Sequence, residues 1–229
     1  MYLLKNKKCY WISIEGTDGT GKTTLSKKLF NYLVKKYPQK KFIFLNEFSD
    51  SKLGNLVKSI IKSETFFSLG KGRHYPISET LVLLADIALQ LEKNILRKNR
   101  KKDIHIVSDR GIATFLAYQA LRLGKAYGEN KILMENLKRI VDLIGHPDIS
   151  ICLVSSMNFI KKRLKNKGDN ISTKNLKFIS DVQNEYISIF EKNKNKKHLI
   201  LENNTGSMKE TALKLFANVD RFIGKKNSG

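Results

Sequence analysis

Residues 16 to 24 combine glycine, lysine and threonine in an order suited to binding phosphate, Gly-Thr-Asp-Gly-Thr-Gly-Lys-Thr-Thr. The run fits the pattern G-x-x-x-x-G-K-T, and the apolar run Tyr10–Ile14 precedes it, as a strand precedes a nucleoside triphosphate loop. Gly16, Gly19 and Gly21 allow the backbone to curl until its N–H groups point into one concavity that accepts phosphate oxygens. The pattern therefore predicts a phosphate-binding loop between a strand and a helix.

Two side chains of this run add chemistry to the backbone. Lys22 can reach the β and γ phosphates of ATP, and the Thr23 hydroxyl can ligate Mg²⁺. A helix that begins near Lys22 would also present the positive end of its dipole. The expected ATP-binding residues are Gly16, Thr17, Asp18, Gly19, Thr20, Gly21, Lys22, Thr23 and Thr24.

A second group of candidate residues follows the apolar run Ile104–Ser108. Asp109 would lie at the carboxyl end of a core strand beside the phosphate loop, where it can organise Mg²⁺ through water. The planar guanidinium of Arg110 suits an anionic phosphate. Tyr118 and Gln119 could stack on a base and hydrogen-bond it, although both residues are also common on an ordinary helix surface.

The stretch from Lys161 to Gly168 is strongly basic. On a helix, Arg163 and Lys167 share a face, and Gly168 is a plausible helix cap that frees the next segment to move. Such a segment could close over the transferring phosphates, supply positive charge and exclude water. A solvated helix end, favoured by the helix dipole, explains the same residues equally well.

Strand-like runs alternate with helix-like stretches along the chain. The strand-like runs are short and nearly continuous in apolar residues, as strands buried on both faces are; they are Tyr10–Glu15, Lys41–Asn46, Ile104–Ser108, Asp148–Val154 and His198–Leu201. The helical stretches are Thr23–Lys36, Ser51–Ser63, Ser78–Arg97, Ala113–Leu123, Lys131–Ile144, Met157–Lys167, Thr173–Lys192 and Ser207–Phe222. We predict an α/β fold of the P-loop NTP hydrolase type: a parallel five-stranded sheet, helices on both faces, and a short basic lid.

Composition limits the class of protein and its partners. With 229 residues, 41% hydrophobic and 28% charged, the chain predicts a single globular domain over 1–229, with a lid near 160–175 and flexible ends at 1–8 and 223–229. No apolar run approaches the roughly 20 residues that cross a bilayer, so no membrane association is expected.

The net charge of +22 could attract a polyanion. We attribute it to lysine-rich solvated faces, because aromatic residues are not interleaved with the basic clusters. Cys9 and Cys152 have no metal or redox spacing, which favours a reduced, cytoplasmic protein.

Taken together, these segments resemble the thymidylate kinase family of nucleoside monophosphate kinases over nearly the whole chain. The opening Glu15–Thr24 is similar to the family's E-G-x-D-G-x-G-K-T-T, and Asp109–Gln119 to its D-R-x-x-x-S-x-x-A-Y-Q, with Thr114 at the serine position. The segment from Asn46-Glu47 to Lys58 resembles the family's R-E-P-G-G-T segment, and the run Glu79–Gln90 resembles its substrate-side helix. Further along, Pro147–Leu153 resembles the P-D-x-x-x-x-L strand, and Arg163 with Gly168 resembles the basic lid.

The resemblance implies roles for the matched residues. Asp18 would contact the sugar side of the acceptor nucleotide, Arg110 its 5′-phosphate, and Arg163 the ATP phosphates, while Thr23 and Asp109 would hold Mg²⁺. Catalysis would depend on Lys22, Arg110 and Arg163, because the loop lacks the arginine that some family members carry there. The implied acceptor-binding residues are Asp18, Glu47, Lys58, Arg110, Thr114, Tyr118 and Gln119.

The resemblance implies a kinase that transfers the γ-phosphoryl group of Mg·ATP to a nucleoside monophosphate, with dTMP favoured and dTDP as product. The substrate helix departs from the family, since Leu83 and Ile87 stand where a phenylalanine and a base-bonding arginine are expected. A kinase of another nucleotide or nucleoside therefore stays open as an alternative, and a basic nucleic-acid-binding ATPase is a third, less favoured one. The family commonly forms dimers, which implies a homodimer; nucleic acid is not expected as a partner.

Overall fold

The computed structural model describes residues 9–63, 68–70, 75–95, 104–128, 131–166, 168, 172–192, 197–204 and 208–227. Its strands are β1 (Trp11–Glu15), β2 (Lys41–Leu45), β3 (Ile104–Asp109), β4 (Ile149–Val154) and β5 (His198–Glu202). Its helices are α1 (Lys22–Lys36), α2 (Lys52–Ser63), α3 (Pro76–Ile95), α4 (Ile112–Tyr127), α5 (Lys131–Ile144), α6 (Met157–Asn166), α7 (Thr173–Lys192) and α8 (Met208–Asn227).

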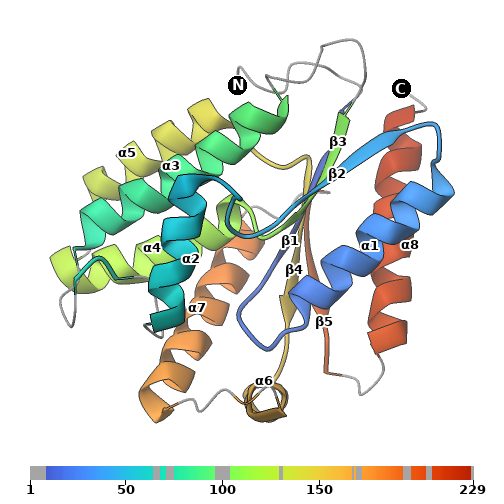
Figure 1. The fold of residues 1–229 in the computed structure, drawn as a ribbon. Coiled ribbons are helices and arrows are strands. Elements are labelled where there is room, and N and C mark those ends of the chain that lie inside the picture. The colour runs from blue at the N-terminus through green and yellow to red at the C-terminus, as the bar shows by residue number, and fades with distance from the viewer. Residues whose placement is uncertain are drawn as a thin grey trace.

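The five strands form one parallel sheet in the order β2-β3-β1-β4-β5. Helices α1 and α8 cover one face, and α3, α4, α5 and α7 cover the other (Figure 1). The predicted α/β class with helices on both faces is confirmed. Because all strands run the same way, their carboxyl ends meet at one edge, and the loops after β1 and β3 lie side by side there.

Alternation along β1 divides the core between the two faces. Ile12 and Ile14 pack with α1 and α8, whereas Trp11 packs with α3, α4 and α5. All three side chains are buried, which accounts for the nearly continuous apolar run in the sequence. The strand is therefore fixed from both sides immediately before the phosphate loop begins.

The observed helix bounds differ from the predicted ones mainly at the ends. Helix α8 continues to Asn227, beyond the predicted end at Phe222, because Ile223 is buried against the core. The frayed end predicted from 223 is thus too long, while the frayed end predicted at 1–8 lies outside the described residues. Within the described ranges, no helix combines the length and apolar character that crossing a membrane requires.

Glu15, the last residue of β1, anchors the helix that follows β3. Its Oε2 atom accepts hydrogen bonds from the backbone N–H groups of Gly111 at 3.1 Å and Thr114 at 3.0 Å, and from the Thr114 hydroxyl at 2.5 Å. These N–H groups belong to the start of α4 and have no partner within the helix. A carboxylate from one strand thus caps the helix of the next crossover and fixes where α4 begins.

Burial raises the pKa of Glu15 above its ordinary value of 4.5, against the lowering effect of its hydrogen bonds with Thr114, Ser13 and Gly111. The folded protein therefore binds this proton more tightly than the unfolded chain, and the stability that the proton provides falls as pH rises. We expect the free energy of unfolding of the wild type to fall relative to Glu15→Gln above pH 4.5 and to level off above the folded pKa. Urea denaturation of both proteins from pH 4 to 8 measures this, and a difference independent of pH would contradict it.

Two leucines on α8 test the packing of that helix on the sheet. Leu215 is completely buried and Leu213 is 58% exposed. Leu215→Ala should lower the free energy of unfolding by about 2–5 kcal/mol, because it removes buried methyl groups and leaves a cavity. Leu213→Ala should change it by less than about 0.5 kcal/mol. Equal losses in urea denaturation would show that α8 does not pack as described.

Candidate active site

The phosphate loop connects β1 to α1 in a conformation that requires glycine. Gly16 has a φ of 140°, and a Cβ atom there would lie 2.6 Å from the carbonyl oxygen of Leu153 on β4. The loop is further closed by the Thr20 hydroxyl, which donates to the Thr17 carbonyl at 2.7 Å. Both threonines are completely buried. The loop is therefore pressed against the sheet, and its shape is set by the packing around it.

Asp18 joins the two cationic residues at this edge of the sheet. Its Oδ1 atom accepts from Lys22 Nζ at 2.8 Å and from the Arg110 guanidinium at 2.6 Å. Both cations are largely buried, while the Asp18 side chain is half exposed. The predicted donor-side residue Lys22 and the predicted acceptor-side residue Arg110 are thus held by one carboxylate oxygen.

Arg110 is the most constrained of the predicted residues. Its guanidinium donates to the Gly16 carbonyl at 3.1 Å, pairs with Glu47 at 2.7 Å, and lies 5.3 Å from the ring centroid of Tyr118. Its φ of 74° is unusual for a residue with a side chain. Although burial opposes the charged form, the carboxylates of Glu47 and Asp18 raise the pKa of Arg110 well above its ordinary value. The residue stays a buried, permanently charged cation.

A cavity of about 330 Å³ opens beside Arg110. Most of the predicted acceptor-binding residues line it: Asp18, Glu47, Arg110, Thr114, Tyr118 and Gln119. Leu83 and Ile87, the two substrate-helix residues that depart from the family pattern, line it as well. Gln119 is buried, and its side-chain amide is hydrogen-bonded with the Thr80 hydroxyl at 2.8 Å. The cavity lining combines charged groups with apolar side chains, as the linings of small-molecule sites commonly do.

Lys58 is the one predicted acceptor-binding residue that does not line this cavity. It pairs with Asp50 at 2.7 Å on the surface of α2. Because Ile61, one turn further along α2, does line the cavity, Lys58 lies on the helix face next to the site, and its role toward the acceptor stays a prediction.

The two residues predicted to hold Mg²⁺, Thr23 and Asp109, differ in exposure. Asp109 ends β3 and is buried, and its Oδ1 atom has no hydrogen-bond partner among the described residues. Thr23 and Thr24 lie in the first turn of α1 with exposed side chains. Asp109 therefore has an acceptor atom, and Thr23 a hydroxyl, available for a ligand.

Arg163 lies on α6, next to the phosphate loop. Its guanidinium donates to the Gly19 carbonyl at 3.1 Å, to Ser155 Oγ at 3.1 Å and to the Asn203 carbonyl at 2.9 Å. Burial lowers the pKa of Arg163. The guanidinium is thus held against the loop instead of extending freely as a mobile lid would.

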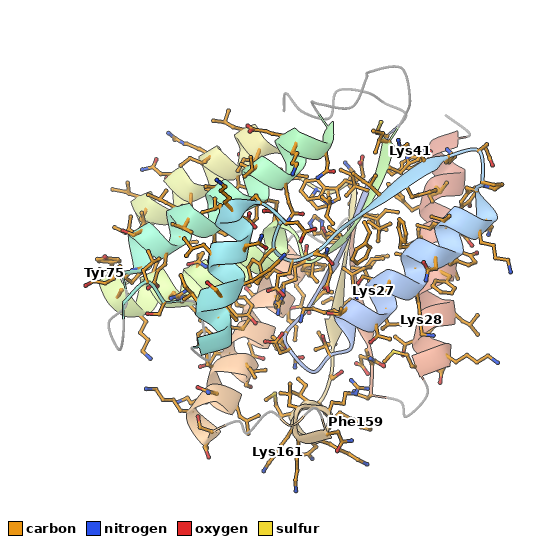
Figure 2. All side chains as sticks on the ribbon, in the orientation of Figure 1. Lys27, Lys28, Lys41, Tyr75, Phe159 and Lys161 are labelled. Atoms are coloured by element: carbon orange, nitrogen blue, oxygen red, sulfur yellow. The ribbon has the colours of Figure 1, made fainter. Side chains whose placement is uncertain are left out.

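The rest of the predicted lid is only partly described. Phe159, whose ring centroid lies 5.6 Å from the Arg163 guanidinium, and the exposed Lys161 project from α6 in Figure 2. Residues 160–166 are packed helix, with Ile160 and Leu164 buried against α7. Lys167 and residues 169–171 lie outside the described residues.

Three polar contacts of the site were missed by the sequence reasoning. Completely buried Asn203 follows β5 and contacts the phosphate loop. Arg122 pairs with buried Glu79, and Asp86 accepts from the Ser49 backbone N–H at 2.9 Å. The position of Asn203 just after a predicted strand was a usable signal, because residues at strand ends gather at one edge. The two pairs connect helices and loops that are distant in sequence, and no local pattern marks them.

Comparison with known proteins identifies the family to which the chain belongs. A family model described as thymidylate kinase matches residues 14–212. A thymidylate kinase of Prochlorococcus marinus is 32% identical over 220 residues, covering 91% of this chain and 97% of the relative. One from Mycoplasma mobile is 29% identical over 220 residues, covering 94% of this chain and all of the relative. The crystal structure of a thymidylate kinase from Ehrlichia chaffeensis shares the fold with a TM-score of 0.63 at 22% identity, over 93% of this chain and 98% of that one. With the matched region running from the end of β1 into α8, the chain belongs to the thymidylate kinase family of ATP-dependent nucleoside monophosphate kinases.

Proposed function

We propose that the protein transfers the γ-phosphoryl group of ATP to dTMP, giving dTDP. The observation that carries this proposal is the position of Arg110, which contacts the phosphate loop through Gly16 and Asp18 and also lines the adjoining cavity. A cation between a donor-phosphate loop and an acceptor cavity suits the 5′-phosphate that must meet the γ-phosphate. Transfer of this kind depends on positioning and charge stabilisation, with little covalent chemistry by the protein.

On the donor side, the loop N–H groups and Lys22 would bind the β and γ phosphates. The start of α1 contributes its dipole to the same place. Arg163 belongs to this side as well, because it is bound to the loop carbonyl of Gly19. Because the guanidinium also donates to Ser155 and Asn203, we propose that its charge acts from a fixed position beside the loop.

On the acceptor side, Arg110 would bind the 5′-phosphate and Asp18 the sugar. Glu47 holds Arg110 in place, while Thr114, Tyr118 and Gln119 form the wall beside it.

The residues present fit a Mg²⁺ ion. Mg²⁺ in nucleotide sites usually keeps several waters and takes only one or two protein ligands besides the phosphates. The unpartnered Oδ1 atom of Asp109 and the exposed Thr23 hydroxyl meet that need, although the described residues contain no cluster of three acidic, histidine or cysteine side chains. When bound, the ion would neutralise charge on the β and γ oxygens.

We also propose the setting in which the enzyme works. One sheet with helices packed on both faces supports a single domain over 1–229, and the basic helix α6 supports a lid near 160–175. Exposed apolar side chains on α3 and α5, such as Leu81 and Leu143, support a homodimer. The two cysteines, Cys9 and Cys152, have neither metal-binding nor redox spacing, which supports a reducing, cytoplasmic location.

The proposal is tested by an acceptor screen. ADP release from Mg·ATP is measured with each common nucleoside, nucleoside monophosphate and, separately, DNA and RNA. We expect kcat/KM to be highest for dTMP. Preference for another acceptor would indicate that the cavity with Leu83 and Ile87 binds a base other than thymine. Turnover stimulated only by nucleic acid, with steep salt dependence, would refute a nucleotide kinase.

Lys22→Ala tests the donor side of the site. It removes a cation from the transferring phosphate, so kcat should fall about 100-fold or more, the size of effect seen when a preorganised donor is removed from a reaction centre. Lys28→Ala is the matched control, because Lys28 is exposed on the same helix (Figure 2). It should leave kcat and both KM values unchanged. Comparable turnover by the two variants would rule out the assigned role of Lys22.

A further inference from the structure

Asn203 is a buried asparagine whose side chain and backbone carbonyl are all hydrogen-bonded around the phosphate loop. Its Nδ2 group donates to the Thr20 carbonyl at 2.7 Å, and its Oδ1 atom accepts from the Thr211 hydroxyl at 3.0 Å. Its own carbonyl accepts from Ser155 Oγ at 2.9 Å and from the Arg163 guanidinium at 2.9 Å. One residue after β5 thus connects α8, α6 and the loop.

The orientation of the Asn203 amide follows from its partners. The carbonyl of Thr20 can only accept, so the group facing it must be the NH₂ group. The Thr211 hydroxyl can donate to the oxygen on the other side, and both side chains are almost completely buried. A flipped amide would place two acceptors against each other at Thr20, which a buried site disfavours. Thr211 therefore helps to hold the amide in the orientation that binds the loop.

Two consecutive carbonyls of the loop are held from this side. Arg163 binds the oxygen of Gly19 at 3.1 Å and Asn203 binds that of Thr20. In a trans peptide the carbonyl and the next N–H point in opposite directions. Holding the Thr20 carbonyl toward Asn203 therefore directs the Gly21 N–H to the opposite side of the loop.

Asn203 lies close to the loop at Gly21. Gly21 has a φ of 86°, and a Cβ atom there would lie 2.9 Å from Asn203 Nδ2. Glycine at this position therefore allows Asn203 to approach the loop closely, directly before Lys22.

We propose that Asn203 is a positioning residue for Mg·ATP: it fixes the peptide between Thr20 and Gly21 directly, and the Gly19 carbonyl through Arg163, so that the loop is ready to bind phosphate. This rests on the proposed function of the loop as the donor site. It predicts an effect on ATP and none on the acceptor, because Asn203 is not among the residues that line the acceptor cavity.

Asn203→Ala is compared with Asn204→Ala. Asn204 is the adjacent residue of the same type, and its Oδ1 atom accepts from the Ser156 backbone N–H at 2.7 Å, at the start of α6. For Asn203→Ala we expect the KM and Kd for Mg·ATP to rise about tenfold, equivalent to roughly one strong hydrogen bond. The KM for dTMP should stay within twofold of wild type. Asn204→Ala should leave all three values within twofold.

The Kd for Mg·ATP is obtained from the rise in melting temperature with nucleotide concentration, which needs no turnover. If wild type binds ATP but does not phosphorylate dTMP, the proposed acceptor fails while the role of Asn203 is still measured. Thr211→Val, which keeps the asparagine and removes only the hydroxyl that orients it, serves as the second variant. It should weaken ATP binding in the same direction by a smaller factor.

The proposal is overturned if Asn203→Ala binds Mg·ATP within twofold of wild type, or if its KM for dTMP rises as much as that for ATP. A fall in the melting temperature of the nucleotide-free protein, with nucleotide affinity unchanged, would mark a role in stability alone. Should Asn203→Ala not fold, Thr211→Val with unchanged ATP affinity overturns the proposal.

Discussion

The buried charge of Arg110 is the constraint on which the site depends. A guanidinium taken out of water costs several kcal/mol unless it is paired and hydrogen-bonded. Here three partners come from two segments: Asp18 and the carbonyl of Gly16 in the phosphate loop, and Glu47 after β2. Because all three must be present, the loop, the end of β2 and the end of β3 are fixed relative to one another. The unusual backbone conformation of Arg110 is kept by the same contacts.

The loop is held by donors on two sides. Arg110 binds the carbonyl of Gly16, whereas Arg163 and Asn203 bind those of Gly19 and Thr20. A loop that presents its N–H groups to phosphate must turn carbonyls elsewhere, and buried carbonyls need donors. The two arginines and the asparagine come from strand ends and from α6, so the architecture of the sheet edge supplies them. The glycine-rich sequence makes the loop conformation accessible, and these surrounding donors select it.

Local patterns made much of this structure predictable. The apolar runs ended close to the observed strands, and the spacing from Gly16 to Thr23 placed the loop between β1 and α1. The omissions concern side-chain partners that no local sequence pattern marks. Nothing near Lys58 shows that it pairs with Asp50, and the charge pattern around Arg163 is the same for a mobile lid as for a side chain held by three oxygens. Side-chain partners across the sheet edge depend on packing, which short-range periodicity does not encode.

The balance of charge at the site explains why the geometry of the loop backbone matters. Lys22 and Arg110 are opposed by Asp18 and Glu47, so these four side chains together carry no net charge. Two nucleotides bring several negative phosphates to this place, and the loop has no arginine of its own. The neutralising interactions must therefore come from the backbone N–H groups, the α1 dipole, the metal ion and the charge of Arg163. Because N–H groups act only when they are correctly aimed, residues that fix the loop carbonyls bear directly on how well this site can hold ATP.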